Sequence, residues 1–325
     1  MIALGKPAVL CYNSDSRTFN GCLEKRTPEF VMESRVLSML QDLSFGVLDN
    51  QYRYCQPQGN DLAVCVRGNE ILLARAEDGT LSLPCVEQVE SWRNGWEQWL
   101  EEPYRYGFTM QEKRYFLWMG AAGEPDDDRY RYIPASVLRE PANKELCFAV
   151  MTAWHLYSWY RSNRFCGRCG HAAVHDGKER MMRCPACGNM MFPRIAPAAI
   201  IGVTHGDRLI LSKYANREYT RYGLIAGFIE IGETAEEAVA REVMEEVGLK
   251  VKNIRYYKSQ PWGIAGNLQI GYFCDLDGED ETVTLDEDEL ASAEWFSRDA
   301  IPYRDEGISL TGEMIRIFQE GREPK

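Results

Sequence analysis

The alternation of hydrophobic and polar positions along the chain predicts a mixed α/β protein. From about residue 5 to residue 135, short apolar runs are separated by turn residues, which is typical of β-strands; these runs are LAVCVRG, EILLARA, TLSLPCV and RYFLWMG. Residues 87–100 have the spacing of a short amphipathic helix, and a longer helix is predicted after Pro141, up to Asn163. The N-terminal segment has no small-residue cleavage site, so it is predicted to be a strand of the mature protein rather than a signal peptide.

The C-terminal part interleaves predicted strands and helices. The predicted strands are AAIIGVTH, RLILSKY, KVKNIRYYKS, LQIGYFCDL and AEWFS, and one helix is predicted from Ala235 and another over residues 311–320. This order favours an α/β sandwich over an all-helical fold. We therefore predict three parts: an N-terminal β-rich domain (1–140), a linker helix with a cysteine cluster (141–192) and a C-terminal α/β domain (193–325).

Residues 70–87 repeat the layout of residues 208–230, with an apolar strand, a turn and a second short strand. One interpretation is that the N-terminal domain is a degenerate duplicate of the C-terminal one, because no cluster of glutamates follows the first copy. The alternative is that two unrelated hairpins look alike.

Composition is that of an ordinary globular protein, with 45% apolar and 26% charged residues and no apolar run long enough to span a membrane. The net charge of −12 argues against a surface that coats nucleic acid, which would need a basic stripe. It fits an enzyme whose carboxylates hold divalent cations. Seven of the 11 cysteines are scattered without the pattern of a disulfide framework, so we predict a reducing, cytoplasmic location.

The other four cysteines form two CxxC pairs, Cys166 with Cys169 and Cys184 with Cys187, separated by 14 residues. Two such pairs at this distance predict a zinc ribbon with four thiolate ligands. Since sulfur fills all four positions, the Zn²⁺ is predicted to be structural. A redox dithiol is the alternative, but thioredoxin-like motifs do not occur in such pairs. Acidic residues among the basic ones of the ribbon favour a scaffold over a nucleic-acid-binding role.

The segment GFIEIGETAEEAVAREVMEEVGL, residues 227–249, predicts a helix with a functional acidic face. Thr234 and Glu237 form a capping box, so the helix should begin at Ala235, and Gly248 can end it. Three glutamates at positions i, i+3 and i+4 share one face; they are Glu242, Glu245 and Glu246. For an arbitrary helix, a solvated acidic face would be the ordinary interpretation.

The whole segment, however, resembles the signature of the Nudix hydrolases at every defined position, from Gly227 through Glu233 and Arg241 to Gly248. The resemblance implies hydrolysis of a diphosphate bond. It also implies that Mg²⁺ or Mn²⁺ is held by carboxylates, which are suitable hard ligands, and by one backbone carbonyl. The implied metal and catalytic residues are Glu242, Glu245, Glu246, Glu289 and the carbonyl of Ala226. Glu289, the implied last ligand or base, has the alternative of a surface acid.

A zinc ribbon directly before such a domain is similar to the NADH pyrophosphatase branch of this superfamily. Ser259-Gln260-Pro261-Trp262 begins like that branch's motif SQPWPFPxS, but residues 263–267 depart from it, which puts the preference among dinucleotides in doubt. The resemblance implies a homodimer that cleaves NADH or NAD⁺ to AMP and nicotinamide mononucleotide and, as a related activity, removes an NAD cap from RNA. The implied substrate contacts are Glu179, Phe192, Phe228, Gln260, Pro261, Trp262, Asn267 and Thr311.

Two alternatives to this function are a hydrolase for another conjugate, such as ADP-ribose or FAD, and a nucleotide-sensing regulator that binds nucleic acid through its ribbon. Intact metal-binding glutamates and the lack of a basic recognition helix count against the regulator.

Overall fold

The computed structural model describes residue 42 and residues 48–92, 102–120, 123–139, 144–215, 221–303 and 307–325. Contacts divide the chain into residues 1–36 and residues 37–325, and all described residues belong to the second unit. The predicted N-terminal strand therefore lies outside the described residues, as does the end of the helix predicted over residues 87–100. Among the described residues, no helix combines the length and hydrophobicity needed to cross a lipid bilayer.

The C-terminal part is built on a six-stranded mixed sheet with the order β15-β16-β12-β13-β17, and β14 pairs with β12. The long strands β12 and β16 run parallel, and the other pairs are antiparallel. The strands are β12 (Ala196–His205), β13 (Arg208–Tyr214), β14 (Ile225–Phe228), β15 (Val251–Trp262), β16 (Asn267–Leu276) and β17 (Leu290–Ser297). Every strand predicted for this part is present, within a few residues of its predicted bounds.

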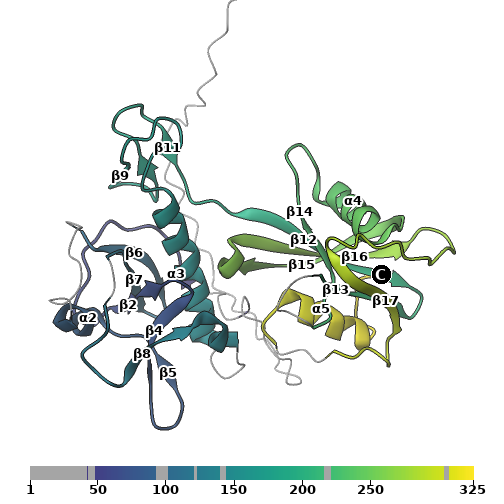
Figure 1. Cartoon of the computed structure of the whole chain (residues 1–325), viewed down its shortest axis with the longest axis horizontal. Coiled ribbons are helices and arrows are strands. Elements are labelled where there is room, and N and C mark those ends of the chain that lie inside the picture. Colours follow the sequence, from purple (N-terminus) through teal and green to yellow (C-terminus); the bar gives the residue numbers. More distant parts are fainter. Residues whose placement is uncertain are drawn as a thin grey trace, which may run out of the picture. The chain divides into compact units, whose positions relative to one another are not determined.

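One helix covers each face of this sheet (Figure 1). The helix α4 (Ala235–Val247) packs on one face through Val239, Val243 and Val247, all fully buried. The helix α5 (Leu310–Gln319) packs on the other through a separate apolar cluster that contains Met314 and Phe318. Each helix buries its apolar stripe against one side of the sheet, so the predicted α/β sandwich is confirmed.

A long helix and a small sheet join the two halves of the chain. The helix α3 (Lys144–Ser162) leads into the short antiparallel strands β9 (Val174–His175), β10 (Met182–Arg183) and β11 (Met190–Met191). One cysteine pair lies in the turn before β9 and the other in the turn between β10 and β11. Met182 packs into the N-terminal core, and the Tyr160 hydroxyl of α3 lies 3.0 Å from Nε2 of His175. These contacts fix the ribbon against its neighbours.

The N-terminal part is β-rich, as predicted, and two helices flank its sheets. The helix α2 (Val86–Trp92) packs against one apolar cluster and α3 packs against another. The strands are β1 (Leu48–Asp49), β2 (Leu62–Val64), β3 (Val66–Arg67), β4 (Glu70–Arg75), β5 (Leu81–Ser82), β6 (Tyr104–Met110), β7 (Lys113–Trp118) and β8 (Tyr130–Pro134), followed by the 3₁₀ turn η2 (Ala135–Arg139).

The strand pairings of the N-terminal part repeat those of the C-terminal sheet. The parallel pair β2 and β7 corresponds to β12 and β16, and the antiparallel pair β6 and β7 corresponds to β15 and β16. The pair β4 and β8 likewise corresponds to β13 and β17. This agreement extends well beyond two similar hairpins, and it supports the interpretation of the N-terminal part as a duplicate. Its α2, with the sequence VEQVESW, lacks the glutamate triplet of α4.

The strands β6 and β8 were not predicted from the sequence. The sequence of β6, YRYGFTM, does alternate aromatic or apolar residues with Arg105, Gly107 and Thr109, so the pattern of a strand was present and was overlooked. The pairing register with β7 shifts between Tyr106 and Phe108, and Gly107 lies at that irregularity. Such a bulge is set by the pairing of two strands and cannot be read from the period of one.

Candidate active site

The helix α4 begins and ends where its sequence predicts. The Thr234 side chain accepts a hydrogen bond from the Glu237 N–H, and the Glu237 carboxylate accepts one from the Thr234 N–H at 2.8 Å. At the other end, Gly248 has a φ of 71° and donates its N–H to the Met244 carbonyl. Both caps satisfy backbone groups that the helix itself leaves unpaired, and they therefore fix the position of the glutamates between them.

The three glutamates of α4 have unequal environments. Glu246 is 2% exposed and Glu242 is 9% exposed, whereas Glu245 has an open side chain. Neither carboxylate oxygen of Glu246 meets the geometry of a hydrogen bond with a described residue, although the Ala226 backbone amide acts on it and favours its ionised form. Burial, together with the charges of Glu242 and Glu289, raises the pKa of Glu246 to about 8. A buried carboxylate without a partner is costly, and a bound cation would remove that cost.

The short strand β14 makes room for one of these carboxylates. A Cβ atom at Gly227 would overlap the carboxylate of Glu242. Position 227 therefore requires glycine for a close approach between strand and helix, not for an unusual backbone angle. Ala226, whose carbonyl is an implied cation ligand, directly precedes it in β14 and pairs with Ile200 of β12.

Replacing Gly227 by alanine should displace the Glu242 carboxylate. A misplacement of about 1 Å at a reacting centre can cost on the order of 10²-fold in rate, so we expect kcat to fall roughly 10- to 100-fold. Steady-state kinetics of the purified variant measure this. The matched control is Gly223→Ala, because a Cβ there meets no other atom within 4 Å; equal losses in both variants would argue against the proposed fit.

Arg241 organises the acidic residues around the loop and helix. Its guanidinium donates to both carboxylate oxygens of Glu233, at 2.8 and 3.0 Å, and to Glu242 and Glu245, each at 2.8 Å. It also donates to the Phe228 carbonyl at 3.0 Å. Through these contacts Arg241 joins Glu233 and the Phe228 carbonyl, in the loop before the helix, to two glutamates of the helix. In the absence of cations, Arg241 also partly neutralises Glu242 and Glu245.

Glu289, far along the chain, contributes its charge to the same place. Its carboxylate raises the pKa of both Glu242 and Glu246, after burial. It is exposed and directly precedes β17, and its carbonyl accepts a hydrogen bond from the Ala215 N–H at 2.8 Å. The charge of Glu289 thus acts on two of the glutamates of α4, although these carboxylates do not meet the distance test that the four cysteines of the ribbon meet. Carboxylates of this kind fit hard divalent cations such as Mg²⁺ or Mn²⁺.

The four cysteines of the ribbon converge on one point. Their sulfur atoms all lie within 4.8 Å of one another, and no other set of described side chains meets that test for a metal cluster. The Sγ atoms of Cys169 and Cys184 are 3.4 Å apart, and those of Cys166 and Cys187 are 3.7 Å apart. Tetrahedral Zn–S bonds of about 2.3 Å separate sulfurs by roughly 3.8 Å, so the spacing fits Zn²⁺.

The thiols of the ribbon ionise unequally. Burial opposes ionisation of Cys166, but hydrogen bonds from the Arg168 and Cys169 amides and from neighbouring thiols lower its pKa to about 6. A hydrogen bond from the Cys187 amide lowers the pKa of Cys184 as well. The His171 amide acts in the same direction on Cys169, but contacts with Cys184 and Cys187 outweigh it and raise the pKa of Cys169 to about 12. The cysteines in the described part of the chain form no disulfides. A closed set of four sulfur ligands leaves no position for a substrate, which makes this a structural site.

Gln260, an implied substrate contact, is fully buried. Its Nε2 donates to the Ile308 carbonyl at 2.8 Å, and its Oε1 accepts from the Leu310 N–H at 2.6 Å. These bonds attach β15 to the first turn of α5, where Thr311 lies. We infer that Gln260 positions this turn.

The Gln260→Ala variant should therefore be less stable. It leaves a buried carbonyl and a buried N–H without partners, which costs about 1–3 kcal/mol for each group, so we expect a loss of roughly 2–6 kcal/mol in the free energy of unfolding. Urea denaturation would measure it. A loss of substrate affinity without any loss of stability would instead indicate direct contact with substrate.

The other implied substrate contacts lie on several elements. Phe192 and Phe228 are 48% and 53% exposed, unlike most aromatic side chains of the core, so both are free to stack on a base.

The remaining implied contacts differ in how far they are buried. Glu179 and Pro261 are exposed, and Thr311 is partly exposed. Trp262 is buried in the N-terminal core cluster. Asn267 is 9% exposed, and its Oδ1 has no partner among the described residues. Their roles in binding remain predictions.

The altered segment after Trp262 has a structural role that sequence reasoning missed. Residues 263–265 form the 3₁₀ turn η4 (Gly263–Ala265), which packs on α3. A Cβ at Gly263 would overlap the Met151 carbonyl, so glycine permits this close approach. In the sequence, the one sign of this contact was that Gly263 stands where the family motif has a proline.

The chain matches known proteins over its second half. The NUDIX domain profile matches residues 193–316, and the NADH pyrophosphatase zinc ribbon domain profile matches residues 161–192. The NAD-capped RNA hydrolase NudC of Pseudomonas aeruginosa is 39% identical over 161 residues, which are 49% of this chain and 57% of that protein. The NudC of Haemophilus influenzae is 35% identical over 192 residues, 58% of this chain and 70% of that protein.

The match to the first of these relatives thus spans little more than half of its length. Among solved structures, a Nudix hydrolase from Nitrosomonas europaea aligns with a TM-score of 0.43 and 22% identity, over 48% of this chain and 91% of that one.

Proposed function

Because the chain belongs to the NADH pyrophosphatase family of Nudix hydrolases, we propose that it hydrolyses the diphosphate bond of NADH or NAD⁺. The products are AMP and nicotinamide mononucleotide. By the same chemistry it removes an NAD cap from the 5′ end of RNA. The observation that carries this proposal is the buried, unpaired carboxylate of Glu246 beside Glu242, on a helix whose caps and Arg241 contacts hold it in place.

In the proposed reaction, water attacks one phosphorus of the diphosphate. Glu242, Glu245, Glu246, Glu289 and the Ala226 carbonyl would hold Mg²⁺ or Mn²⁺. When bound, such a cation neutralises phosphate charge and lowers the pKa of water. Arg241 holds the carboxylates of Glu242 and Glu245 in position through hydrogen bonds, and the missing side chain of Gly227 leaves the space that the Glu242 carboxylate occupies. The exposed Phe192 and Phe228 are proposed to stack on the bases.

The assembly and location are also proposals. We propose a homodimer, supported by exposed apolar side chains on and beside the ribbon: Val174, Met190, Phe192 and Ile195 are each about half exposed or more, at 50%, 52%, 48% and 63%. Sedimentation equilibrium tests this. We propose the cytoplasm as the location, because four convergent thiols remain available for Zn²⁺ only in a reducing compartment.

The decisive test is a substrate panel. We expect Mg²⁺- or Mn²⁺-dependent release of AMP from NADH, NAD⁺ and NAD-capped RNA to be faster than hydrolysis of ADP-ribose or FAD. If NADH and NAD⁺ were the poorest substrates, the proposed specificity would be wrong, while the diphosphatase chemistry would stand.

The competing specificity for ADP-ribose or FAD rests on one observation. The segment after Trp262 lacks the proline-rich continuation of the family motif, and its turn η4 packs on α3 instead. Because this segment is proposed to form one wall of the substrate site, its change can favour a group other than nicotinamide at one end of the substrate. The substrate panel described above distinguishes NADH and NAD⁺ from ADP-ribose and FAD.

A further inference from the structure

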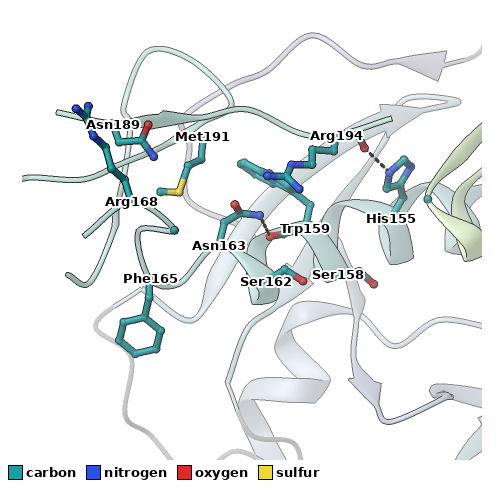
Figure 2. Close-up of a pocket in the computed structure, with 12 residues that line it drawn as sticks. His155, Ser158, Trp159, Ser162, Asn163, Phe165, Arg168, Asn189, Met191 and Arg194 are labelled. Carbon is teal, nitrogen blue, oxygen red and sulfur yellow. Dashed lines mark hydrogen bonds between the residues drawn. The ribbon is translucent and has the colours of Figure 1, made fainter. Parts of the chain in front are cut away.

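A cavity lined by both polar and apolar side chains lies apart from the glutamate cluster, where α3, the ribbon and the start of β12 meet (Figure 2). Its volume is about 610 Å³, within the range of small-molecule sites. His155 and Ser158 come from α3, Arg168 and Asn189 come from the ribbon, and Arg194 lies on the segment that leaves the ribbon. A cavity of this size can hold a nucleotide.

The charge of this cavity opposes that of the chain. None of the described residues that line it is acidic, although the whole chain carries a net charge of −12. Arg168 and Arg194 are exposed, and neither guanidinium takes part in an ion pair between described residues. Ser158, Ser162 and Asn163 add further polar groups. Unpaired guanidiniums with neighbouring hydroxyl and amide groups are suited to phosphate.

An apolar side of the same cavity can receive a base. Trp159 is 5% exposed, and its Nε1 donor has no partner among the described residues, while Met191 packs beside the N-terminal core. Phe165 lines the cavity with 60% of its surface exposed. Phe165 therefore offers an exposed aromatic face in a cavity that also has cationic side chains, a combination that single-stranded nucleic acids use.

The cavity also adjoins the segment implied in dinucleotide selection. Gly266 lines it and directly precedes Asn267, and the Arg194 carbonyl lies 2.8 Å from Nε2 of His155 (Figure 2). The backbone at Arg194 is therefore fixed by α3, and the following strand β12 starts beside Gly266 through the Ala196 N–H, which donates to the Gly266 carbonyl at 3.1 Å. A ligand here would lie next to one wall of the predicted substrate site.

We propose that this cavity binds a phosphorylated nucleoside, with Arg194 contacting its phosphate and Arg168, which lies on the other side of Met191 (Figure 2), contacting a neighbouring phosphate when the nucleoside is part of a chain. If the bound nucleoside belongs to an RNA chain with an NAD cap, this proposal rests on the proposed function. A free mononucleotide that binds beside the dinucleotide has the same phosphate and base and is the alternative ligand.

The test compares Arg168→Ala/Arg194→Ala with the matched variant Arg161→Ala, whose exposed arginine on α3 does not line the cavity. Binding of a short NAD-capped oligoribonucleotide, of NAD⁺ and of AMP in saturating NAD⁺ is measured by calorimetry, on proteins that also carry Glu246→Gln to prevent turnover. We expect affinity for the capped oligonucleotide to fall at least about tenfold in the double variant, with NAD⁺ binding unchanged. Each phosphate that a protein neutralises on a single strand adds about 0.7 to the steepness with which log affinity falls against log salt concentration. For two lost phosphate contacts, this slope should become shallower by about 1.4.

Arginine-dependent binding of AMP with no effect on the oligonucleotide would support the free nucleotide as the source. Unchanged binding of both would overturn the proposal, and so would an equal loss of NAD⁺ affinity, because the cavity would then belong to the dinucleotide site itself. Failure of the proposed function is distinct: the wild-type chain would release no AMP from any NAD substrate, whatever the arginine dependence of binding.

Discussion

The Glu246→Gln variant should fold normally and lose nearly all turnover. Removing a single group that stabilises transition-state charge typically costs about 10²- to 10³-fold in kcat, and loss of a cation ligand should reach or exceed ~10³-fold. Glutamine has the same shape, and position 246 forms no side-chain hydrogen bond with a described residue that the change would break. Kinetics with saturating Mg²⁺ or Mn²⁺, together with circular dichroism, would test both parts.

The control for this variant is Glu236→Gln, an exposed glutamate in the first turn of the same helix. It should retain wild-type kcat. If Glu246→Gln kept a kcat within a few fold of wild type, the assigned cation site would be wrong.

The raised pKa of Glu246 adds a dependence of stability on pH. Its pKa is about 8 in the folded protein against an ordinary value of 4.5, so the unfolded chain loses this proton more readily. Without a cation, Glu246 therefore destabilises the fold progressively as pH rises from about 4.5 to about 8. The cation-free Glu246→Gln variant should have a Tm at or above that of wild type at pH 8, and the difference should vanish near pH 4.

Protons and cations also compete for these oxygens, so stabilisation of the wild-type protein by added cation should increase with pH over the same range. A cation-induced rise in Tm that is equal in Glu246→Gln and wild type would contradict this account.

Loss of the ribbon Zn²⁺ should be the largest effect on stability. Structural zinc contributes about 10–16 kcal/mol to folding of zinc-finger peptides, as much as the whole stability of many domains. Met182 of the ribbon packs in the N-terminal core, and the His175 ring lies within hydrogen-bond distance of the Tyr52 and Tyr160 hydroxyls. Unfolding of the ribbon would therefore also expose part of the N-terminal core. We expect Cys184→Ser to bind no zinc and to lower Tm by at least about 10 °C.

Metal analysis and differential scanning calorimetry measure the two effects, and treatment of the wild-type chain with a strong chelator should reproduce them. The matched control is Cys55→Ser, a partly buried cysteine outside the ribbon. One equivalent of zinc retained by Cys184→Ser would show that this cysteine is not a ligand.

The two halves of the molecule show that fold alone does not produce the site. Both share the pairing scheme of a central parallel pair with an antiparallel neighbour, and both place a helix on each face. Only α4 carries the triplet of glutamates, and the position of α2 carries VEQVESW. The proposed chemistry therefore depends on a few side chains added to a common scaffold.

Local patterns in the amino-acid sequence were enough to predict most of the helices, turns and metal-binding loops of this protein. The bounds of α4, its two caps, the glutamate spacing and the two cysteine pairs all follow from residues within a few positions of one another, where helix periodicity and knuckle geometry act directly. The strands of the C-terminal sheet were predictable for the same reason. The strand β6 was overlooked although its sequence YRYGFTM has the same two-residue period, and only its register shift at Gly107 depends on pairing with β7.

Tertiary structure alone decided how these elements work together. It buries Glu246 while leaving Glu245 open, places Glu242 over Gly227, and uses Gln260 to hold the start of α5. It also sets η4 against α3 and forms the cavity between Arg168 and Arg194. Each of these features joins residues far apart in the chain, and burial, close approach and shared fields depend on that packing rather than on any local pattern.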